Sequence, residues 1–307
     1  PWVTPQPPTG PEPDPTAVPT PVPLPVRAVD PAGITYGPSG DLFIVDSEIN
    51  EPDLVGVYAH AGGNVFEMAP NGAYVATYDL TAEPVEDREP TGIAWAGGSV
   101  FYVTNDDTRM LYRYSFDGTS FTPDGAVSTE NANPVLDLYD PEGVTVDAAG
   151  NIYVLDQLRK RIGVYTYSGG FTLNAVLDLG ALNPDRPTPR SGEGISFDPD
   201  SGNLFIVSQV DLATGYAIFE YTTAGEYVGQ YDIGGFGPSP SVSAAPYHDV
   251  SAIDAPGGIA VSGGVFYLVD SAVDNGRVDQ EYVPGPPVEI PEQSYERDGV
   301  VYVGSIP

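Results

Sequence analysis

The chain of 307 residues contains no cysteine, a single lysine and two histidines. Without cysteine it can form neither a disulfide framework nor a thiolate zinc site. Its 11 basic residues are outnumbered by 43 acidic ones, which gives a formal charge of −32. Nucleic acid and anionic membrane surfaces are therefore excluded as partners, because binding to either requires basic side chains that neutralise phosphate. The sequence also lacks an apolar run of about 18 residues, so no membrane span is expected.

The scarcity of histidine restricts the catalytic chemistry that this chain could carry. The two histidines, His60 and His248, both lie in segments that contain Gly, Ala or Pro. Two residues cannot build a zinc or general-base centre that depends on several histidines. The Gly-x-Ser-x-Gly motif of a nucleophile elbow is absent, so a Ser-His-Asp triad is not expected either. The sequence thus predicts no catalytic residues and a protein that is not an enzyme.

Residues 1–25 form a segment of different composition, in which eleven of the 33 prolines occur and Glu12 and Asp14 are the only charges. This composition predicts an extended Pro/Thr-rich arm in the polyproline II conformation. Trp2 and Val3 are the residues by which such an arm would attach to a neighbouring copy or another partner. Its threonines, placed among prolines, are typical of O-linked glycosylation. The chain starts with proline, with no initiator Met and no apolar segment after it, as a mature product does whose targeting segment was removed or never included. We therefore expect a secreted protein, extracellular or at the cell surface.

Five copies of a short pattern divide the rest of the chain. Each copy has a glycine followed by a β-branched residue, then a turn, and then a continuous apolar run such as that ending at Asp156. The repeated glycines are Gly33, Gly92, Gly143, Gly194 and Gly258, separated by 59, 51, 51 and 64 residues. A period of this length is that of a four-stranded propeller blade. We therefore predict an all-β fold, a β-propeller of five blades, with six blades as the alternative.

Within each unit the pattern predicts four strands. The first two form a hairpin, and the second strand is apolar on both faces. Alternating segments farther along predict third strands at 111–116, 161–167, 217–222 and 277–282, and outer strands at 73–80, 135–139, 175–179 and 227–233. The last blade has two candidate closing strands. One is residues 26–30, which include Val26, Arg27 and Val29, and the other is residues 300–304.

The third unit carries a resemblance to a known family. Its sequence from Pro141 to Asp156, continued by Arg161–Tyr165, is similar to an NHL repeat, and Asn275–Val278 resembles the segment before that repeat's third strand. The resemblance implies that residues 26–307 form an NHL-like β-propeller. Such propellers include protein-interaction modules, RNA binders, lyases and relatives of calcium-dependent hydrolases, so the fold alone does not determine the activity.

Two acidic residues, Glu142 and Glu193, directly precede repeat glycines. They are expected near the end of the innermost strand, where propeller channels gather ligands. Lactonase-like relatives hold a channel calcium with such acids and amides, and calcium prefers oxygen ligands. The equivalent residues Ala32, Thr91 and Gly257 cannot supply a carboxylate. The expectation is therefore no cofactor, with calcium held by the two glutamates as the alternative.

Other acidic residues are explained by the local backbone. The turns at 147–151 and 198–203 contain the Asp, Asn and Gly that tight hairpin turns require, and they lack the twelve-residue spacing of a calcium loop. Asp46, Asp156 and Asp270 lie near the ends of second strands, where we interpret their side chains as backbone caps.

Three basic charges occur together at Arg159, Lys160 and Arg161. They predict a patch that contacts an acidic face of a neighbouring copy. With the arm, the patch favours a non-catalytic structural or adhesive propeller in a cell-surface or filamentous assembly, a homo-oligomer or polymer joined by strand addition through the N-terminal arm. One alternative is a calcium-dependent hydrolase or lyase with its site in the central channel, and another is small-molecule or glycan binding by the loops.

Overall fold

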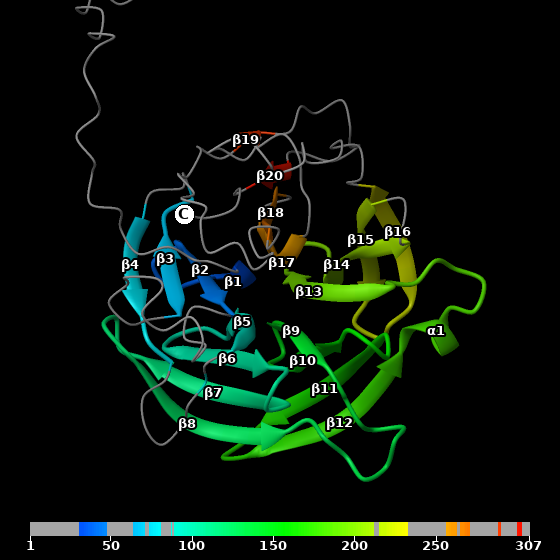
Figure 1. Cartoon of the computed structure of the whole chain (residues 1–307), viewed down its shortest axis with the longest axis horizontal. Helices are drawn as coiled ribbons and strands as arrows, with labels where there is room; N and C mark the ends of the chain where they lie inside the picture. Colours follow the sequence, from blue (N-terminus) through cyan, green and yellow to red (C-terminus); the bar gives the residue numbers. More distant parts are fainter. Residues whose placement is uncertain are drawn as a thin grey trace, which may run out of the picture.

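The computed structural model describes residues 31–47, 64–70, 74–80, 87, 89–211, 215–232, 256–262, 265–270, 288–289 and 300–302. In this part of the chain the sheets are arranged around a central axis, so the all-β propeller is confirmed (Figure 1). The predicted Pro-rich arm with Trp2 and Val3, the strand containing Val26, Arg27 and Val29, and both histidines lie outside the described residues. No helix in the described part is long and apolar enough to cross a bilayer.

Four sheets are regular blades, each an antiparallel meander of four strands. Their strands, in chain order, are β1 (Pro31–Tyr36), β2 (Leu42–Asp46), β3 (Val65–Met68), β4 (Tyr74–Tyr78), β5 (Pro90–Trp95), β6 (Val100–Asn105), β7 (Met110–Phe116), β8 (Phe121–Ser128), β9 (Pro141–Val146), β10 (Ile152–Asp156), β11 (Arg161–Tyr167), β12 (Phe171–Asp178), β13 (Ser191–Asp198), β14 (Asn203–Asp211), β15 (Gly215–Thr222) and β16 (Tyr227–Asp232). A short helix, α1 (Leu179–Leu182), follows β12.

The fifth sheet has a different topology. It contains β17 (Pro256–Ser262), β18 (Val265–Asp270), β19 (Val288–Glu289) and β20 (Val300–Tyr302) in the order β17-β18-β20-β19, and β20 pairs with β18 in parallel. The described residues thus give four regular blades, not the five or six that the sequence predicts. The segment at 300–304 enters this sheet beside β18 rather than as its outer strand.

The second strands are buried as the apolar runs predict. Every residue of β2 and β10 is buried, because each blade stacks its faces on its two neighbours. Between the first two blades the core is aromatic, and the rings of Phe43, Phe101, Phe116 and Phe121 pack with centroids 4.6 to 6.4 Å apart. This packing fixes the angular position of each blade around the axis.

The predicted outer strand at 135–139 is wrong. The outer strand of the second blade is β8, which pairs with β7 across a turn where Gly118 has φ 93° and the Asp117 carboxylate accepts the backbone N–H of Ser120. The sequence of β8 alternates between small, polar and apolar residues, and that pattern was too weak to predict a strand. Residues 129–140 instead connect the second blade to the third, with Leu138 fully buried against β11.

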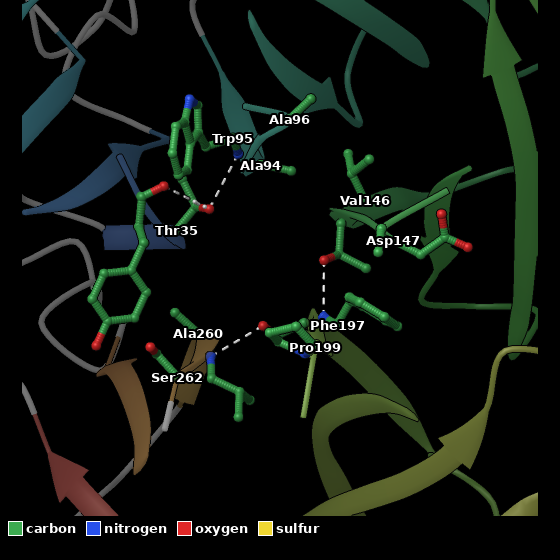
Figure 2. Close-up of a pocket in the computed structure, with 15 residues that line it drawn as sticks. Thr35, Ala94, Trp95, Ala96, Val146, Asp147, Phe197, Pro199, Ala260 and Ser262 are labelled. Carbon is green, nitrogen blue, oxygen red and sulfur yellow. Dashed lines mark hydrogen bonds between the residues drawn. The ribbon is translucent and has the colours of Figure 1, made fainter. Parts of the chain in front are cut away.

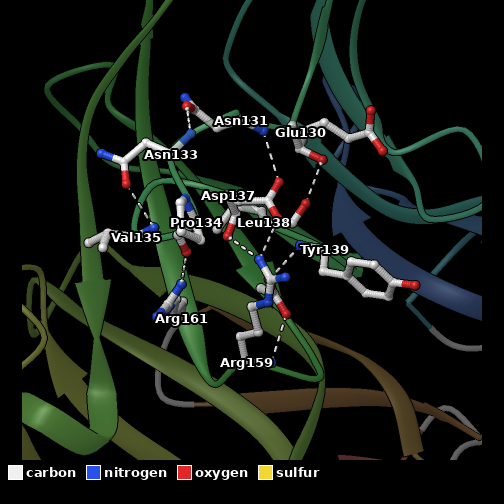
Figure 3. A network of polar contacts seen from close by, with 12 residues as sticks. Glu130, Asn131, Asn133, Pro134, Val135, Asp137, Leu138, Tyr139, Arg159 and Arg161 are labelled. Carbon is white, nitrogen blue, oxygen red and sulfur yellow. Dashed lines mark hydrogen bonds and ion pairs between the residues drawn. The ribbon is translucent and has the colours of Figure 1, made fainter.

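This connection is held by side chains of the basic patch (Figure 3). Arg159 donates to the carbonyl of Asp137 at 3.1 Å and to its carboxylate at 2.5 Å, and Arg161 donates to the carbonyl of Pro134 at 2.8 Å. Lys160 has a left-handed backbone, with φ 56°. Two of the three basic residues therefore have partners within the chain, and a contact with another copy stays a prediction.

The repeated glycines form a ring that we call the glycine collar: Gly33, Gly92, Gly143, Gly194 and Gly258. A Cβ on Gly33 would lie 2.7 Å from the Cα of Gly92, and one on Gly194 would lie 2.8 Å from the Cα of Gly258. At Gly258 the nearest atom would be the carbonyl oxygen of Ala32 at 2.6 Å, so the ring returns to β1. The inner strands therefore touch backbone to backbone around the axis, which only glycine permits.

Candidate functional site

Acidic side chains gather where the inner strands begin. We call this group the acidic mouth: Asp106, Asp140, Glu142 and Glu193. Asp106 follows β6, Asp140 precedes β9, and the two glutamates lie one residue before collar glycines in β9 and β13. Three blades thus contribute carboxylates to one end of the channel.

Three of these carboxylates form a compact cluster. One oxygen each from Asp106, Asp140 and Glu142 lies within 4.8 Å of the others, and all three residues are half-buried. The backbone of Glu142 is fixed because its carbonyl accepts the hydroxyls of Thr91, at 3.2 Å, and of Thr104. The cluster is therefore built on a rigid strand rather than on a free loop.

The surroundings of the cluster disfavour its negative charge. Burial raises the pKa of Asp140 above its ordinary value, and the charges of Asp106 and Asp156 raise it further, while Arg109 opposes the shift. Burial also raises the pKa of Asp106. Arg109 itself pairs with Glu130 at 2.7 Å and lies over the ring of Tyr139 at 3.8 Å. Its charge is thus shared with groups outside the cluster.

Glu193 lies beside this cluster and has neutral partners. Its carboxylate accepts hydrogen bonds from Gln157 at 2.6 Å and from Ser191 at 2.9 Å. Burial raises its pKa, the two hydrogen bonds lower it, and the charge of Asp140 raises it. The effect of Asp140 links Glu193 to the cluster electrostatically.

The propeller repeat explains why the cluster is unusual. Gln157 follows the second strand of its blade and donates to Glu193 of the next blade. Asp106 occupies the position of Gln157 one blade earlier, and Glu142 occupies the position of Glu193. Gln157 and Glu193 combine an amide with a carboxylate. Asp106 and Glu142, at the same positions one blade earlier, are two carboxylates, and Asp140 is a third beside them. Like charges at this distance repel, so a cation or a shared proton among these carboxylates would be favourable.

The structure brings Glu142 and Glu193 to the same mouth, and calcium binding by them stays a prediction. Asp106 and Asp140 were missed because they lie outside the repeat position of the two glutamates. A signal for Asp140 was available, since Asp or Glu precedes the proline of three units, at Asp30, Glu89 and Asp140.

The other acidic residues behave as turn and cap residues where they are described. The Asp147 carboxylate accepts the backbone N–H groups of Ala149 and Asn151, and Asp198 accepts that of Ser201. Asp156 accepts the backbone N–H of Tyr139 at 2.7 Å and is buried. Asp46 is buried at the end of β2.

Comparison with known proteins supports the fold. No protein-family model matches the chain, so the NHL family is not confirmed, and no curated protein matches its sequence. Among solved structures, virginiamycin B lyase from Staphylococcus aureus is 17% identical with a TM-score of 0.41, over 80% of this chain and 64% of the lyase. A glutaminyl cyclase from Myxococcus xanthus is 13% identical with a TM-score of 0.48, over 78% and 85% of the two chains. A gluconolactonase from Xanthomonas campestris is 17% identical with a TM-score of 0.42, over 80% and 74%.

These findings correct two predictions made from the sequence. The comparisons run against the prediction of a non-catalytic structural or adhesive subunit that is not an enzyme, since the similar propellers named above are a lyase, a cyclase and a gluconolactonase. The chain spans about two thirds of the length of the lyase, 64%. At these identities the likeness concerns the fold, so the activity has to be argued from the residues of the site.

Proposed function

We propose that the acidic mouth binds a divalent cation, calcium by its ligand chemistry, and that the chain is a calcium-dependent hydrolase or lyase. The observation that supports this is the cluster of Asp106, Asp140 and Glu142, whose carboxylate oxygens lie within 4.8 Å of one another. A doubly charged cation would relieve the repulsion among three carboxylates that burial has already made unfavourable.

The donor set fits calcium better than zinc or a soft metal. All three ligands are hard oxygens, and the chain has no cysteine. Calcium takes about six to eight oxygens, so three side chains leave positions for water and a substrate oxygen. When bound at such an open site, the cation polarises a substrate carbonyl.

The residues of the chain would position the reacting groups. Asp106, Asp140 and Glu142 hold the cation at the mouth, and Glu193, oriented by Gln157 and Ser191, lies beside them to accept or return a proton at its carboxylate. With a formal charge of −32, the protein repels anionic substrates and attracts cationic ones, while neutral substrates are neither attracted nor repelled. We infer esters or related carbonyl compounds without negative charge as the substrate class.

Calcium is expected to stabilise the folded protein, and chelation to remove that effect. At a concentration one hundred times the Kd, a bound ion adds about 2.7 kcal/mol to the free energy of unfolding. Thermal unfolding with calcium or EDTA measures this, for the wild type and for Asp106→Asn, which loses a ligand. The matched control is Asp185→Asn, since Asp185 is exposed after α1. Calcium should stabilise the Asp185→Asn control as much as it stabilises the wild type. It should stabilise the Asp106→Asn variant much less. Equal stabilisation of all three, or none, contradicts the site.

The activity is tested separately from the metal. The wild type is expected to hydrolyse the neutral ester phenyl acetate when calcium is present. This activity should be lost with EDTA and in Asp140→Asn, whereas Asp185→Asn should keep the wild-type rate. If calcium stabilises the protein and no neutral or cationic ester is turned over, the metal site stands and the hydrolase or lyase assignment falls.

Three finer features of the architecture are proposed with it. We infer that the units are NHL-type repeats, that the fifth sheet acts as the closing blade because β17 packs between β13 and β1, and that the protein is secreted. The contact of β17 with both neighbouring inner strands supports ring closure.

A further inference from the structure

A cavity lies at the end of the inner strands opposite the acidic mouth. Its volume is about 300 Å³, and its walls are the ends of β1, β5, β9, β13 and β17 with the turns that follow. The acidic mouth is at the starts of the same strands, and the glycine collar lies between the two. This pocket is therefore separate from the proposed cation site.

The pocket is organised by one position of the repeat. The residue two places after each collar glycine is, in blade order, Thr35, Ala94, Thr145, Ser196 and Ala260. Each of the three hydroxyls accepts a backbone N–H from the next blade (Figure 2). These donors are Trp95 to Thr35 at 3.2 Å, Phe197 to Thr145 at 2.9 Å and Val261 to Ser196 at 3.1 Å.

Two alanines interrupt this ring of hydroxyls. By the same register, Ala94 faces the N–H of Val146, and Ala260 faces the N–H of Tyr36, because β17 adjoins β1. A methyl group cannot accept a hydrogen bond. At these two positions the preceding blade therefore offers no acceptor.

The strand pairing directs both N–H groups toward the axis. Tyr36 pairs with Leu42. The next pair toward the turn is a hydrogen-bonded pair, in which the N–H of Gly37 donates at 2.8 Å. Val146 pairs with Ile152, and again the next N–H, of Asp147, is bonded within the hairpin at 3.0 Å. Hydrogen-bonded and non-hydrogen-bonded pairs alternate along an antiparallel ladder. The N–H groups of Tyr36 and Val146 hence point away from their own hairpins.

The remaining lining carries no charge toward the pocket. Asp147 is its one ionisable acid, and its carboxylate is turned into its own turn, where it accepts from Ala149, Asn151 and the Tyr153 hydroxyl at 2.7 to 3.0 Å. Figure 2 shows this carboxylate directed away from the centre. Tyr36, Trp95 and Phe197 also line the pocket, and their rings pack at the same time against the hydrophobic cores. The pocket is thus uncharged, aromatic-lined and supplied with donors.

We propose that this pocket binds an uncharged small molecule that presents a carbonyl oxygen, of an amide or an ester, beside a flat apolar group. The carbonyl accepts the N–H of Tyr36 or Val146, and the apolar group lies against the aromatic lining. An anion is disfavoured by the charge of −32 and by the absence of a cationic side chain among the lining residues described. The volume fits a ligand of about ten to fifteen heavy atoms.

The test uses N,N-dimethylbenzamide, a neutral probe with a carbonyl acceptor and no N–H, titrated into the ¹⁵N-labelled full chain. The amide resonances of Tyr36 and Val146 are expected to shift on binding. Benzoate, which carries the same ring and a negative charge, should bind at least about tenfold more weakly.

The decisive variant places a hydroxyl, the group present at this position in the other three blades, at both alanine positions. Ala94→Ser with Ala260→Ser supplies hydroxyls to the N–H groups of Val146 and Tyr36, so probe binding should weaken at least about tenfold while the melting temperature stays equal or rises. Ala148→Ser, at an exposed lining residue, is the control and should bind as the wild type does. The proposal is overturned by probe binding that leaves the two amides unshifted, by no binding, or by equal affinity in the double variant.

Discussion

Replacing Gly92 by alanine is expected to destabilise the fold by about 3 kcal/mol, at the upper end of what overpacking costs. The new Cβ would lie 2.4 Å from the carbonyl oxygen of Glu142 and 2.5 Å from the hydroxyl of Thr104. Neither atom can move easily, because that carbonyl also accepts the hydroxyl of Thr91 and belongs to the next inner strand. The strain would be passed to the contact between the second and third blades.

Urea unfolding of Gly92→Ala beside Gly170→Ala measures this effect. Gly170 lies in the turn between β11 and β12, and a Cβ there would meet no atom within 4 Å. The control should change the free energy of unfolding by less than about 0.5 kcal/mol. If the two variants are equally stable, the inner strands are not in backbone contact at the collar. Gly92→Ala should also weaken stabilisation by calcium, because it displaces Glu142.

The collar is the part of the fold that could be predicted most directly from the sequence. A glycine that recurs at the same place in five units, with apolar strands after it, indicates one backbone position that tolerates no side chain. The inner and second strands of four blades follow from the same local pattern. The third strands at 111–116, 161–167 and 217–222 were also predicted, and are confirmed in β7, β11 and β15.

The outer edge was harder to predict because the outer strand meets solvent on one side. In β8 buried or half-buried residues alternate with exposed ones, and the sequence Phe121–Ser128 includes Pro and Gly, so its apolar signal is weak. The segment at 135–139 has the better strand composition, yet its Leu138 is used to fill the space over Gly163 and its Asp137 to bind Arg159. Tertiary contacts therefore decide the structure of that segment, and such contacts cannot be read from a local pattern.

The acidic mouth shows a second limit of sequence analysis. Glu142 could be identified as a candidate ligand from its repeat position, but Asp106 is 36 residues away in the previous blade. Their proximity depends on how adjacent blades align around the axis. The comparison of Asp106 and Glu142 with Gln157 and Glu193 becomes available only when that alignment is known. Only that alignment shows that three carboxylates lie together where the neighbouring blade has an amide and a carboxylate.

A buried carboxylate between the first two blades leads to the other large effect. Asp87 is completely buried, and its side chain accepts hydrogen bonds from Asn105 at 2.9 Å and from the hydroxyl of Tyr114 at 3.2 Å. Burial raises its pKa from 3.8 to about 7, although both hydrogen bonds act to lower it. The folded protein thus keeps a proton on Asp87 at pH values where the unfolded chain has lost it.

The sign of the pH dependence follows from this difference. Between the unfolded pKa of 3.8 and the folded pKa of about 7, the folded state binds more protons than the unfolded state, so the free energy of unfolding falls as the pH rises. Above that window the full cost of the buried charge is present. At about 1.4 kcal/mol for each pKa unit, the cost is on the order of 4 kcal/mol.

Asp87→Asn is expected to remove this dependence. The asparagine oxygen can accept from Asn105, and the Tyr114 hydroxyl can donate instead to the carbonyl of Leu80, 3.4 Å away. Urea unfolding of both proteins across the window should give a difference that is small at its acid end and grows in favour of the variant toward its alkaline end. Taking the difference cancels the repulsion among the other acidic residues, which both proteins share. Asp87→Ala is the control for lost hydrogen bonds, since it leaves Asn105 without its acceptor and Tyr114 with only the longer contact to Leu80, and it should destabilise at every pH. A difference between wild type and Asp87→Asn that does not change with pH would mean that Asp87 is already ionised throughout, and that Asn105 and Tyr114 suffice to stabilise a charge in this core.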